Sequence, residues 1–202
     1  FTVNDGTTDS ASSYTMTVDV TAVNDAPTAS NNTVTTNEDT DHTFAASEFG
    51  FTDVDGDSLD HVSIETLPSN GTLLLSGVAI SAGDQISAAN ISNLVFRPAA
   101  NANGASYDTF TFTVNDGTTD SASSYTMTVD VTAVNDAPTA SNNTVTTNED
   151  TDHTFAASEF GFTDVDGDSL DHVSIETLPS NGTLLLSGVA ISAGDQISAA
   201  NI

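Results

Sequence analysis

Residues 110–114 read Phe-Thr-Phe-Thr-Val, and residues 14–21 read Tyr-Thr-Met-Thr-Val-Asp-Val-Thr. In both stretches an apolar side chain alternates with a polar one, which is the two-residue period of a β-strand with one buried and one solvent-facing side. A helical period of 3.6 residues is nearly absent elsewhere in the chain. These patterns predict an all-β protein whose strands bury Phe and Val and expose Thr.

The sequence repeats itself with a period of 111 residues. Residues 1–91 recur without a mismatch at residues 112–202, so that Phe1 corresponds to Phe112. A period of this length is that of a whole domain, because domains commonly contain about 100–150 residues. The chain is therefore predicted to be an array of identical domains.

The repeat boundary is expected at Val23-Asn24-Asp25-Ala26-Pro27, which recurs at residues 134–138, because proline ends a strand and biases its predecessor toward extended backbone. This boundary divides the chain into three parts. Residues 1–24 are predicted to be the C-terminal strands of a preceding repeat, residues 25–135 a complete repeat, and residues 136–202 the N-terminal part of the next.

Other segments of the complete repeat also have strand character. They are expected at residues 33–36, 42–46, 61–67, 72–80 and 94–97, with a hairpin turn at Ser76-Gly77. A short helical turn is expected around residues 83–89. About seven short strands over about 100 residues are typical of an immunoglobulin-like or cadherin-like antiparallel β-sandwich.

The composition is strongly acidic. The chain has 29 Asp and Glu residues and a single basic side chain, Arg97, giving a formal net charge of -28. Nucleic acid is excluded as a partner because phosphate binding needs clustered Lys and Arg. No stretch approaches the roughly 20 apolar residues of a membrane-spanning helix, so no membrane insertion is expected. Arg97 is expected to pair with a carboxylate on the sheet face.

The core is predicted to be small. Leu, Ile, Val and Phe make up 46 of 202 residues, which is close to the composition below which a highly charged chain stays disordered. The chain has no Cys and therefore no disulfides or thiolate metal sites. Something other than the core should help to stabilise this fold.

The acidic residues favour Asp over Glu by 23 to 6. Short Asp side chains in loops suit turn formation and oxygen ligation of Ca²⁺, whereas general surface acidity would use either residue. The clusters fall between the predicted strands. They are Asn24-Asp25, Asn37-Glu38-Asp39, Asp53-Val54-Asp55-Gly56-Asp57 and Asn115-Asp116, with a lone Asp108 at the start of a strand.

Alternating strand directions predict which clusters meet. The 53–57 loop and Asn115-Asp116 should lie at the end of the repeat nearest Asn24-Asp25. The opposite end should carry Glu38, Asp39 and Asp108 beside the linker residues Asn135 and Asp136. Across the junction, the next repeat should contribute Asp164, Asp166 and Asp168. Carboxylates so close together repel one another by about 1 kcal/mol per pair in water. Ca²⁺, which takes six to eight oxygen ligands, would remove that repulsion.

These motifs in their order resemble the cadherin-like extender repeats of giant bacterial RTX adhesins, which leave the cell by type I secretion. The resemblance rests on Val-Asn-Asp-Ala-Pro, Asn-Glu-Asp, Asp-Val-Asp-Gly-Asp and Phe-Thr-Val-Asn-Asp-Gly and spans the whole 111-residue unit. It implies a location at the bacterial cell surface and Ca²⁺ ions shared between neighbouring repeats.

The resemblance also implies a ligand set. Asn135, Asp136, Glu38, Asp108, Asp164 and Asp166 would share the ions of one junction, and Asn24, Asp25, Asp53 and Asp55 those of the preceding junction. Asp39, Asp57, Asn115, Asp116, Glu149 and Asp168 belong to the same acidic clusters and complete the candidate metal ligands. The linker is shorter than in cadherins, and Asp108 lacks a neighbouring Glu, so the resemblance leaves the number of ions open.

Other readings of these residues fit less well. Counted from Asp53, glycine is fourth and Glu65 thirteenth, which does not match an EF-hand loop. His42 and His61 have no second nitrogen or sulfur ligand at local spacing, and no Gly-x-Ser-x-Gly motif occurs, so no enzyme is predicted.

The sequence thus predicts a calcium-rigidified spacer of a long surface adhesin, whose partners are the neighbouring repeats in a monomeric filament segment. The alternative is a repeat that itself adheres, either to its own kind or to a glycan. The absence of Trp and the presence of only three Tyr argue against that alternative, because exposed aromatic platforms are scarce.

Overall fold

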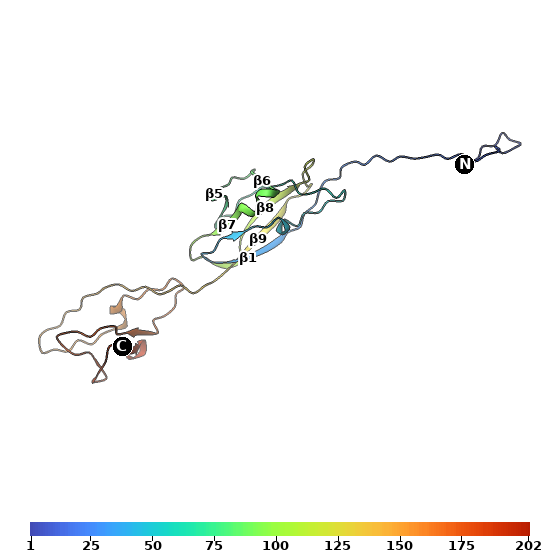
Figure 1. Ribbon diagram of the computed structural model, residues 1–202. Coiled ribbons are helices and arrows are strands. Elements are labelled where there is room, and N and C mark those ends of the chain that lie inside the picture. The colour runs from blue at the N-terminus through green and yellow to red at the C-terminus, as the bar shows by residue number, and fades with distance from the viewer.

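In the computed structural model, which describes residues 1–202, the 25–135 repeat is a sandwich of two β-sheets (Figure 1). One sheet has the strand order β1-β9-β8-β3-β6 and the other β2-β7-β4-β5. The first sheet contains β1 (Asn32–Asn37), β9 (Tyr125–Thr132), β8 (Gly104–Asn115), β3 (His61–Ile64) and β6 (Gln85–Ser87). The second contains β2 (His42–Thr43), β7 (Leu94–Pro98), β4 (Gly71–Leu75) and β5 (Val78–Ala79).

This architecture confirms the all-β, immunoglobulin-like sandwich predicted from the sequence. It has nine strands instead of seven, because the predicted 72–80 segment forms the β4–β5 hairpin and residues 85–87 form β6. The helical turn expected at residues 83–89 is therefore wrong. The short 3-10 helices instead span Ala46–Phe49 (η1) and Ala88–Asn93 (η2).

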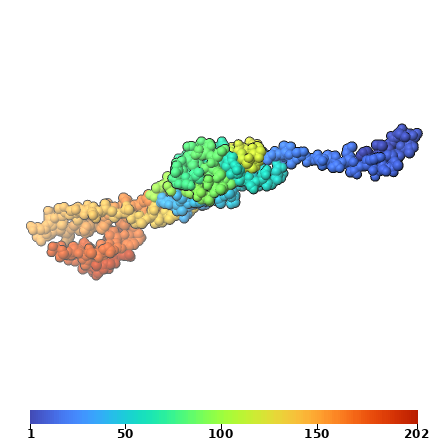
Figure 2. All heavy atoms as spheres, turned by 45° about the horizontal axis from the view of Figure 1, so that its top comes forward, coloured from blue at the N-terminus to red at the C-terminus, as the bar shows by residue number.

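One strand pair departs from the antiparallel prediction. β1 runs parallel to β9, from Asn32 opposite Met127 to Asn37 opposite Thr132. The first and last strands of the repeat therefore point the same way, and the chain leaves at the end opposite to the one where it enters. Figure 2 shows the consequence, with the three parts of the chain following one another along one line.

The core lies between the two sheets. It consists of 16 buried apolar residues contributed by both sheets and by η1 and η2. Phe44 packs edge-on against Phe110 at 5.6 Å between ring centroids, and Phe49 packs against Phe112 at 4.9 Å. Strand β8 thus supplies the rings that complete the core.

Arg97 forms the predicted ion pair. Its Nε and Nη2 donate to the two carboxylate oxygens of Asp41 at 2.8 and 2.7 Å, across the exposed side of β2 and β7. This contact raises the pKa of Arg97 and lowers the pKa of Asp41.

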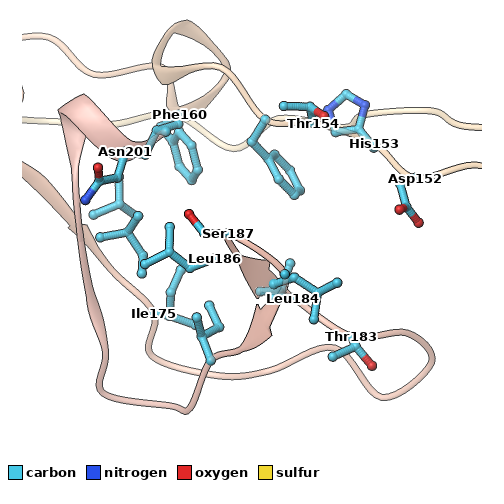
Figure 3. A pocket seen from close by; sticks show the side chains of 17 residues that line it. Asp152, His153, Thr154, Phe160, Ile175, Thr183, Leu184, Leu186, Ser187 and Asn201 are labelled. Carbon is cyan, nitrogen blue, oxygen red and sulfur yellow. The ribbon is translucent and has the colours of Figure 1, made fainter.

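Residues 136–202 correspond to residues 25–91 of the complete repeat; they include no counterpart of β7, β8 or β9, and we refer to them as the open unit. They contain η3 (Ala157–Phe160), the pairs β10 (His172–Ser174) with β13 (Gln196–Ser198) and β11 (Leu185–Leu186) with β12 (Val189–Ala190), and η4 (Ala199–Asn201). A hollow of about 510 Å³ is lined by apolar side chains that include Phe160, Ile175 and Leu184 (Figure 3). These three residues are copies of Phe49, Ile64 and Leu73, which are buried in the core of the complete repeat.

Residues 1–24 form no strand; an isolated bridge joins Asn4 to Asp9. The strand predicted at residues 14–21 is therefore wrong in this position, although its copy at residues 125–132 is β9. The difference arises because β9 pairs with β1 and β8, while residues 14–21 have no neighbouring strand. None of the helices is long or apolar enough to reach across a bilayer.

Candidate metal centre at the repeat junctions

The first junction joins the linker at Asn24-Asp25 to two loops of the complete repeat. The backbone N–H of Asp25 donates to Asp55 Oδ2 at 2.7 Å. Asn24 Nδ2 donates to Asp116 Oδ2 at 3.0 Å, a contact between residues 92 positions apart. The 53–57 loop and the loop after β8 therefore both lie against the linker.

The 53–57 loop gathers three carboxylates. Oxygens of Asp53, Asp55 and Asp57 lie within 4.8 Å of one another. Asp53 Oδ1 accepts the backbone N–H groups of Asp55 at 2.8 Å and Asp57 at 3.1 Å, which closes the loop. Asp53 Oδ2 is buried without a hydrogen-bond partner. A buried, unpartnered carboxylate oxygen beside two further carboxylates has the donor chemistry of a hard-cation site.

Asp116 and Asn115 stabilise the hairpin loop between β8 and β9 by side-chain hydrogen bonds. Asp116 is buried, and its Oδ1 accepts the N–H groups of Thr118 and Thr119 at 2.6 and 2.7 Å. Hydrogen bonds from Asn24 and from this loop lower the pKa of Asp116. Asn115 Nδ2 donates to Asp120 at 2.7 Å. The Asp116 carboxylate thus stays ionised at the junction, while the Asn115 side chain is used within its own loop.

The second junction brings carboxylates of two repeats to one linker residue, Asp136. Its backbone N–H donates to Asp166 Oδ2 at 2.7 Å, the same contact that Asp25 makes with Asp55. Asp136 Oδ2 is buried without a partner. Burial raises the pKa of Asp136, and the negative charges of Asp166, Asp39, Glu38 and Asp164 raise it further. The site therefore holds more negative charge than its hydrogen bonds compensate.

Glu38 and Asp39 reach this junction from the end of β1. Glu38 is only 3% exposed; its Oε1 accepts the N–H of Val134 at 2.5 Å and its Oε2 the side-chain amide of Asn103 at 3.0 Å. These bonds lower the pKa of Glu38. Asp39 has a positive φ of 55° and accepts the N–H of Asn101 at 3.0 Å.

Asn101 and Asn103 are additional residues of this junction that were not predicted from the sequence. They lie in the turn before β8 and contact Asp39 and Glu38 across 62 and 65 residues. Residues 101–104 read Asn-Ala-Asn-Gly, a composition that favours a turn, but nothing local shows which acids this turn meets. Asn101 also lines a hollow of about 380 Å³ at the second junction, together with Asp136, Thr139 and Asp164.

Asp108 lies elsewhere. It is buried, and its carboxylate accepts the backbone N–H groups of Ser69, Asn70 and Gly71 at 2.9, 2.6 and 2.9 Å. Both oxygens are used to hold the turn between β3 and β4. The structure therefore does not bring Asp108 into the junction cluster around Asp136.

The remaining candidates lie in the open unit. The Asp164-Asp166-Asp168 loop has the same closing bonds as its copy, with Asp164 Oδ1 accepting the N–H groups of Asp166 and Asp168 at 3.0 and 3.1 Å. Glu149 is exposed and its side chain has no partner, whereas its copy Glu38 is buried. Asn135 Nδ2 donates to the carbonyl oxygen of Asp136 at 2.8 Å, leaving the Asn135 Oδ1 free for another partner.

This donor set fits Ca²⁺ better than other common cations. It offers carboxylate and amide oxygens and no sulfur or imidazole nitrogen, so it does not suit zinc. Ca²⁺ accepts irregular sets of six to eight oxygens, while Mg²⁺ requires near-ideal octahedral geometry and keeps several waters. Loops from two domains meeting at a linker favour the more tolerant ion.

The histidines are engaged in local pairs. His42 Nε2 lies 3.3 Å from Glu48 Oε2, and His61 Nδ1 lies 2.8 Å from Asp60 Oδ2. The hollow in the open unit includes His153, but its Nε2 lies 3.2 Å from Glu159 Oε2, in the same pair as its copy His42. This recurrence in both units indicates a structural pair.

Comparison with known proteins agrees with the fold. A family model described as the bacterial Ig domain matches residues 24–132 and again residues 135–196. These matches cover most of the chain, and the chain therefore belongs to the bacterial Ig domain family. Domains of this family are typically non-enzymatic structural repeats and are often exposed at the bacterial surface. Searches of curated proteins and of solved structures each found no match.

Proposed function

We propose that this chain is a segment of a calcium-rigidified spacer, in which tandem repeats hold a distal binding domain of a long bacterial adhesin away from the cell. The observation that supports the proposal is the convergence on Asp136 of carboxylates from two successive repeats. The linker gathers Glu38 and Asp39 from one side and Asp164 and Asp166 from the other, and their mutual repulsion would favour binding of a cation there.

The parallel pairing of β1 and β9 supports an extended arrangement. Because entry and exit lie at opposite ends of the repeat, each added unit lengthens the chain. Ca²⁺ bound at the junction would fix the angle between neighbours, and without Ca²⁺ the carboxylates would push the two repeats apart. The ion at the first junction would be held by Asp53, Asp55, Asp57 and Asp25. The Asp116 carboxylate would contribute further negative charge from the neighbouring loop.

Extracellular calcium modules commonly bind with Kd of about 10⁻⁴ to 10⁻³ M. At the low Ca²⁺ concentration inside a cell such junctions would stay loose, and they would tighten once outside. This behaviour would suit export as a slack chain followed by stiffening at the surface.

Small-angle X-ray scattering on a chain of several repeats tests the proposal. We expect the maximum dimension to increase and the interdomain flexibility to decrease when millimolar Ca²⁺ replaces chelator. Mg²⁺ at the same concentration should have a much smaller effect. A scattering profile that is the same with Ca²⁺ and with chelator would rule the proposal out.

The alternative, that the repeats adhere to one another, makes a different prediction. Sedimentation in Ca²⁺ would then show concentration-dependent association of the chain. We expect a monomer at all concentrations, because every copy carries a net charge of -28.

A further inference from the structure

The turn before β4 carries an Asn-Gly pair at Asn70-Gly71, which recurs at Asn181-Gly182. An Asn side chain followed by Gly is open to attack from the next backbone nitrogen, since Gly has no side chain to hinder the approach. The Gly nitrogen loses its proton and bonds to the Asn Cγ, and ammonia leaves. Water then opens the five-membered imide to give aspartate or isoaspartate, the second of which reroutes the backbone.

Packing fixes both residues of the pair in the complete repeat. A Cβ on Gly71 would lie 2.3 Å from Cζ of the buried Phe96 and 2.8 Å from the carbonyl oxygen of Arg97, so no larger residue fits there. Asn70 Nδ2 donates to the carbonyl oxygen of Tyr107 at 3.1 Å, and the Tyr107 hydroxyl donates to the Asn70 carbonyl oxygen at 2.7 Å. The fold therefore retains a sequence that is chemically vulnerable.

The buried Asp108 carboxylate restrains the reacting groups. Its Oδ2 accepts the N–H groups of Asn70 and Gly71 at 2.6 and 2.9 Å. The Gly71 nitrogen, which is the attacking atom, is held by one hydrogen bond, and the Asn70 side-chain amide is held by another to Tyr107. A closed imide ring would require both bonds to break and β4 to move.

The copy in residues 136–202 has none of these restraints. Nothing lies within 4 Å of a Cβ placed on Gly182, which has a φ of +123°. Asn181 is exposed, and its side chain makes no hydrogen bond. The same two residues are thus held in one part of the molecule and free in the other.

We infer that Asn70-Gly71 is a latent deamidation site that Asp108 holds closed, and that Asn181-Gly182, which makes no such contact, is an unprotected reference for it. A repeat whose β8 separates from the sandwich would expose the pair and convert it irreversibly. The added charge and altered backbone at the Phe96 contact would then prevent that repeat from closing. Conversion at this site would be irreversible, and this inference does not depend on bound metal.

Peptide mapping by mass spectrometry on the 202-residue chain tests this inference. After incubation in neutral buffer we expect conversion at Asn70 to be at least about tenfold slower than at Asn181, because protection follows the free energy of local opening. In concentrated urea the two rates should become equal, since the flanking sequences are identical. Equal rates in native buffer would overturn the inference.

A pair of variants tests the role of Asp108. Asp108→Asn should accelerate conversion at Asn70 and leave Asn181 unchanged. Asp130→Asn is the matched control, because Asp130 also accepts a backbone N–H, from Ser106 at 2.6 Å, but does not contact the pair. Hydrogen exchange at β4 reports whether Asp108→Asn still folds. A folded Asp108→Asn protein in which Asn70 stays as slow as in the parent would show that Asp108 is not the restraint.

Discussion

The same sequence has two structures in this molecule. Residues 112–132 form the end of β8 and all of β9, and residues 1–21, which are identical to them, form no strand. Met127 and Val129 are fully buried, whereas their copies Met16 and Val18 are 75% and 78% exposed. Alternation of apolar and polar residues therefore makes a segment able to form a strand, but a neighbouring strand and an opposing sheet decide whether it does.

The two linkers give a second comparison of the same kind. Asp25 and Asp136 make the same backbone contact to the acidic loop that follows them. Asp136 also has Glu38 and Asp39 of the complete repeat beside it, and their charges add to the burial that raises its pKa. The excess negative charge around Asp136 thus comes from carboxylates of both repeats and not from the linker residues alone.

The largest effect is expected from truncating one of two identical phenylalanines. Phe112→Ala should destabilise the complete repeat by about 3–5 kcal/mol, because Phe112 is fully buried between Phe49 and Phe110. Phe1→Ala is the matched control and should leave the unfolding transition unchanged, since Phe1 is 59% exposed. Chemical denaturation measures both, and a comparable loss in the two variants would contradict the comparison.

Calcium should stabilise the chain by an amount that depends on Asp136. At a Ca²⁺ concentration about 100 times the Kd, one site adds about 2.7 kcal/mol. Asp136→Asn should remove much of the Ca²⁺-dependent stiffening seen by scattering, because it takes a carboxylate from the shared cluster. Asp25→Asn should leave the second junction unaffected. If the two variants stiffen equally at that junction, Asp136 is not a ligand there.

Acid should act on the calcium-free junction in two opposite steps. The pKa of Asp136 is raised in the folded chain, which means that its negative charge destabilises the junction. Protonation removes this charge as the pH falls through the raised pKa, so the junction should tighten. The pKa values of Glu38 and Asp116 are lowered, so their stabilising contribution is present above the unfolded values of about 4 and is lost as the pH falls through the lowered ones.

Scattering and thermal unfolding with chelator, from pH 7 to pH 3, follow these two steps. Asp136→Asn should abolish the first and keep the second. A junction that loosens steadily with acid from pH 7 downward would be inconsistent with the raised pKa of Asp136.

The smallest effect is expected at the single ion pair. Asp41→Asn should destabilise the complete repeat by about 0.2–1 kcal/mol, because the side chains of Arg97 and Asp41 are 58% and 38% exposed and water screens the pair. Asp152→Asn, the same change in the open unit, should have no measurable effect, since the only Lys or Arg side chain, Arg97, is paired with Asp41. The difference should shrink in 1 M salt. A salt-independent loss would point to a role of Asp41 beyond this pair.

Several features follow from the sequence alone. Period-two alternation predicted the all-β sandwich, the 111-residue repeat set the unit, and the position of the acids between strands placed them at the ends of the repeat. These are local properties, because side-chain alternation and turn chemistry act within a few residues. The pairing of Arg97 with a carboxylate followed from its being the only basic side chain.

The tertiary structure decided the rest, because those features depend on residues far apart in the chain. It paired β1 with β9 in parallel, assigned Asp108 to the turn before β4, and brought Asn101 and Asn103 to Asp39 and Glu38. Identical segments with and without neighbouring strands show the reason most directly. A strand is stabilised by hydrogen bonds and burial that other segments supply, so its own sequence specifies its pattern but not its partners.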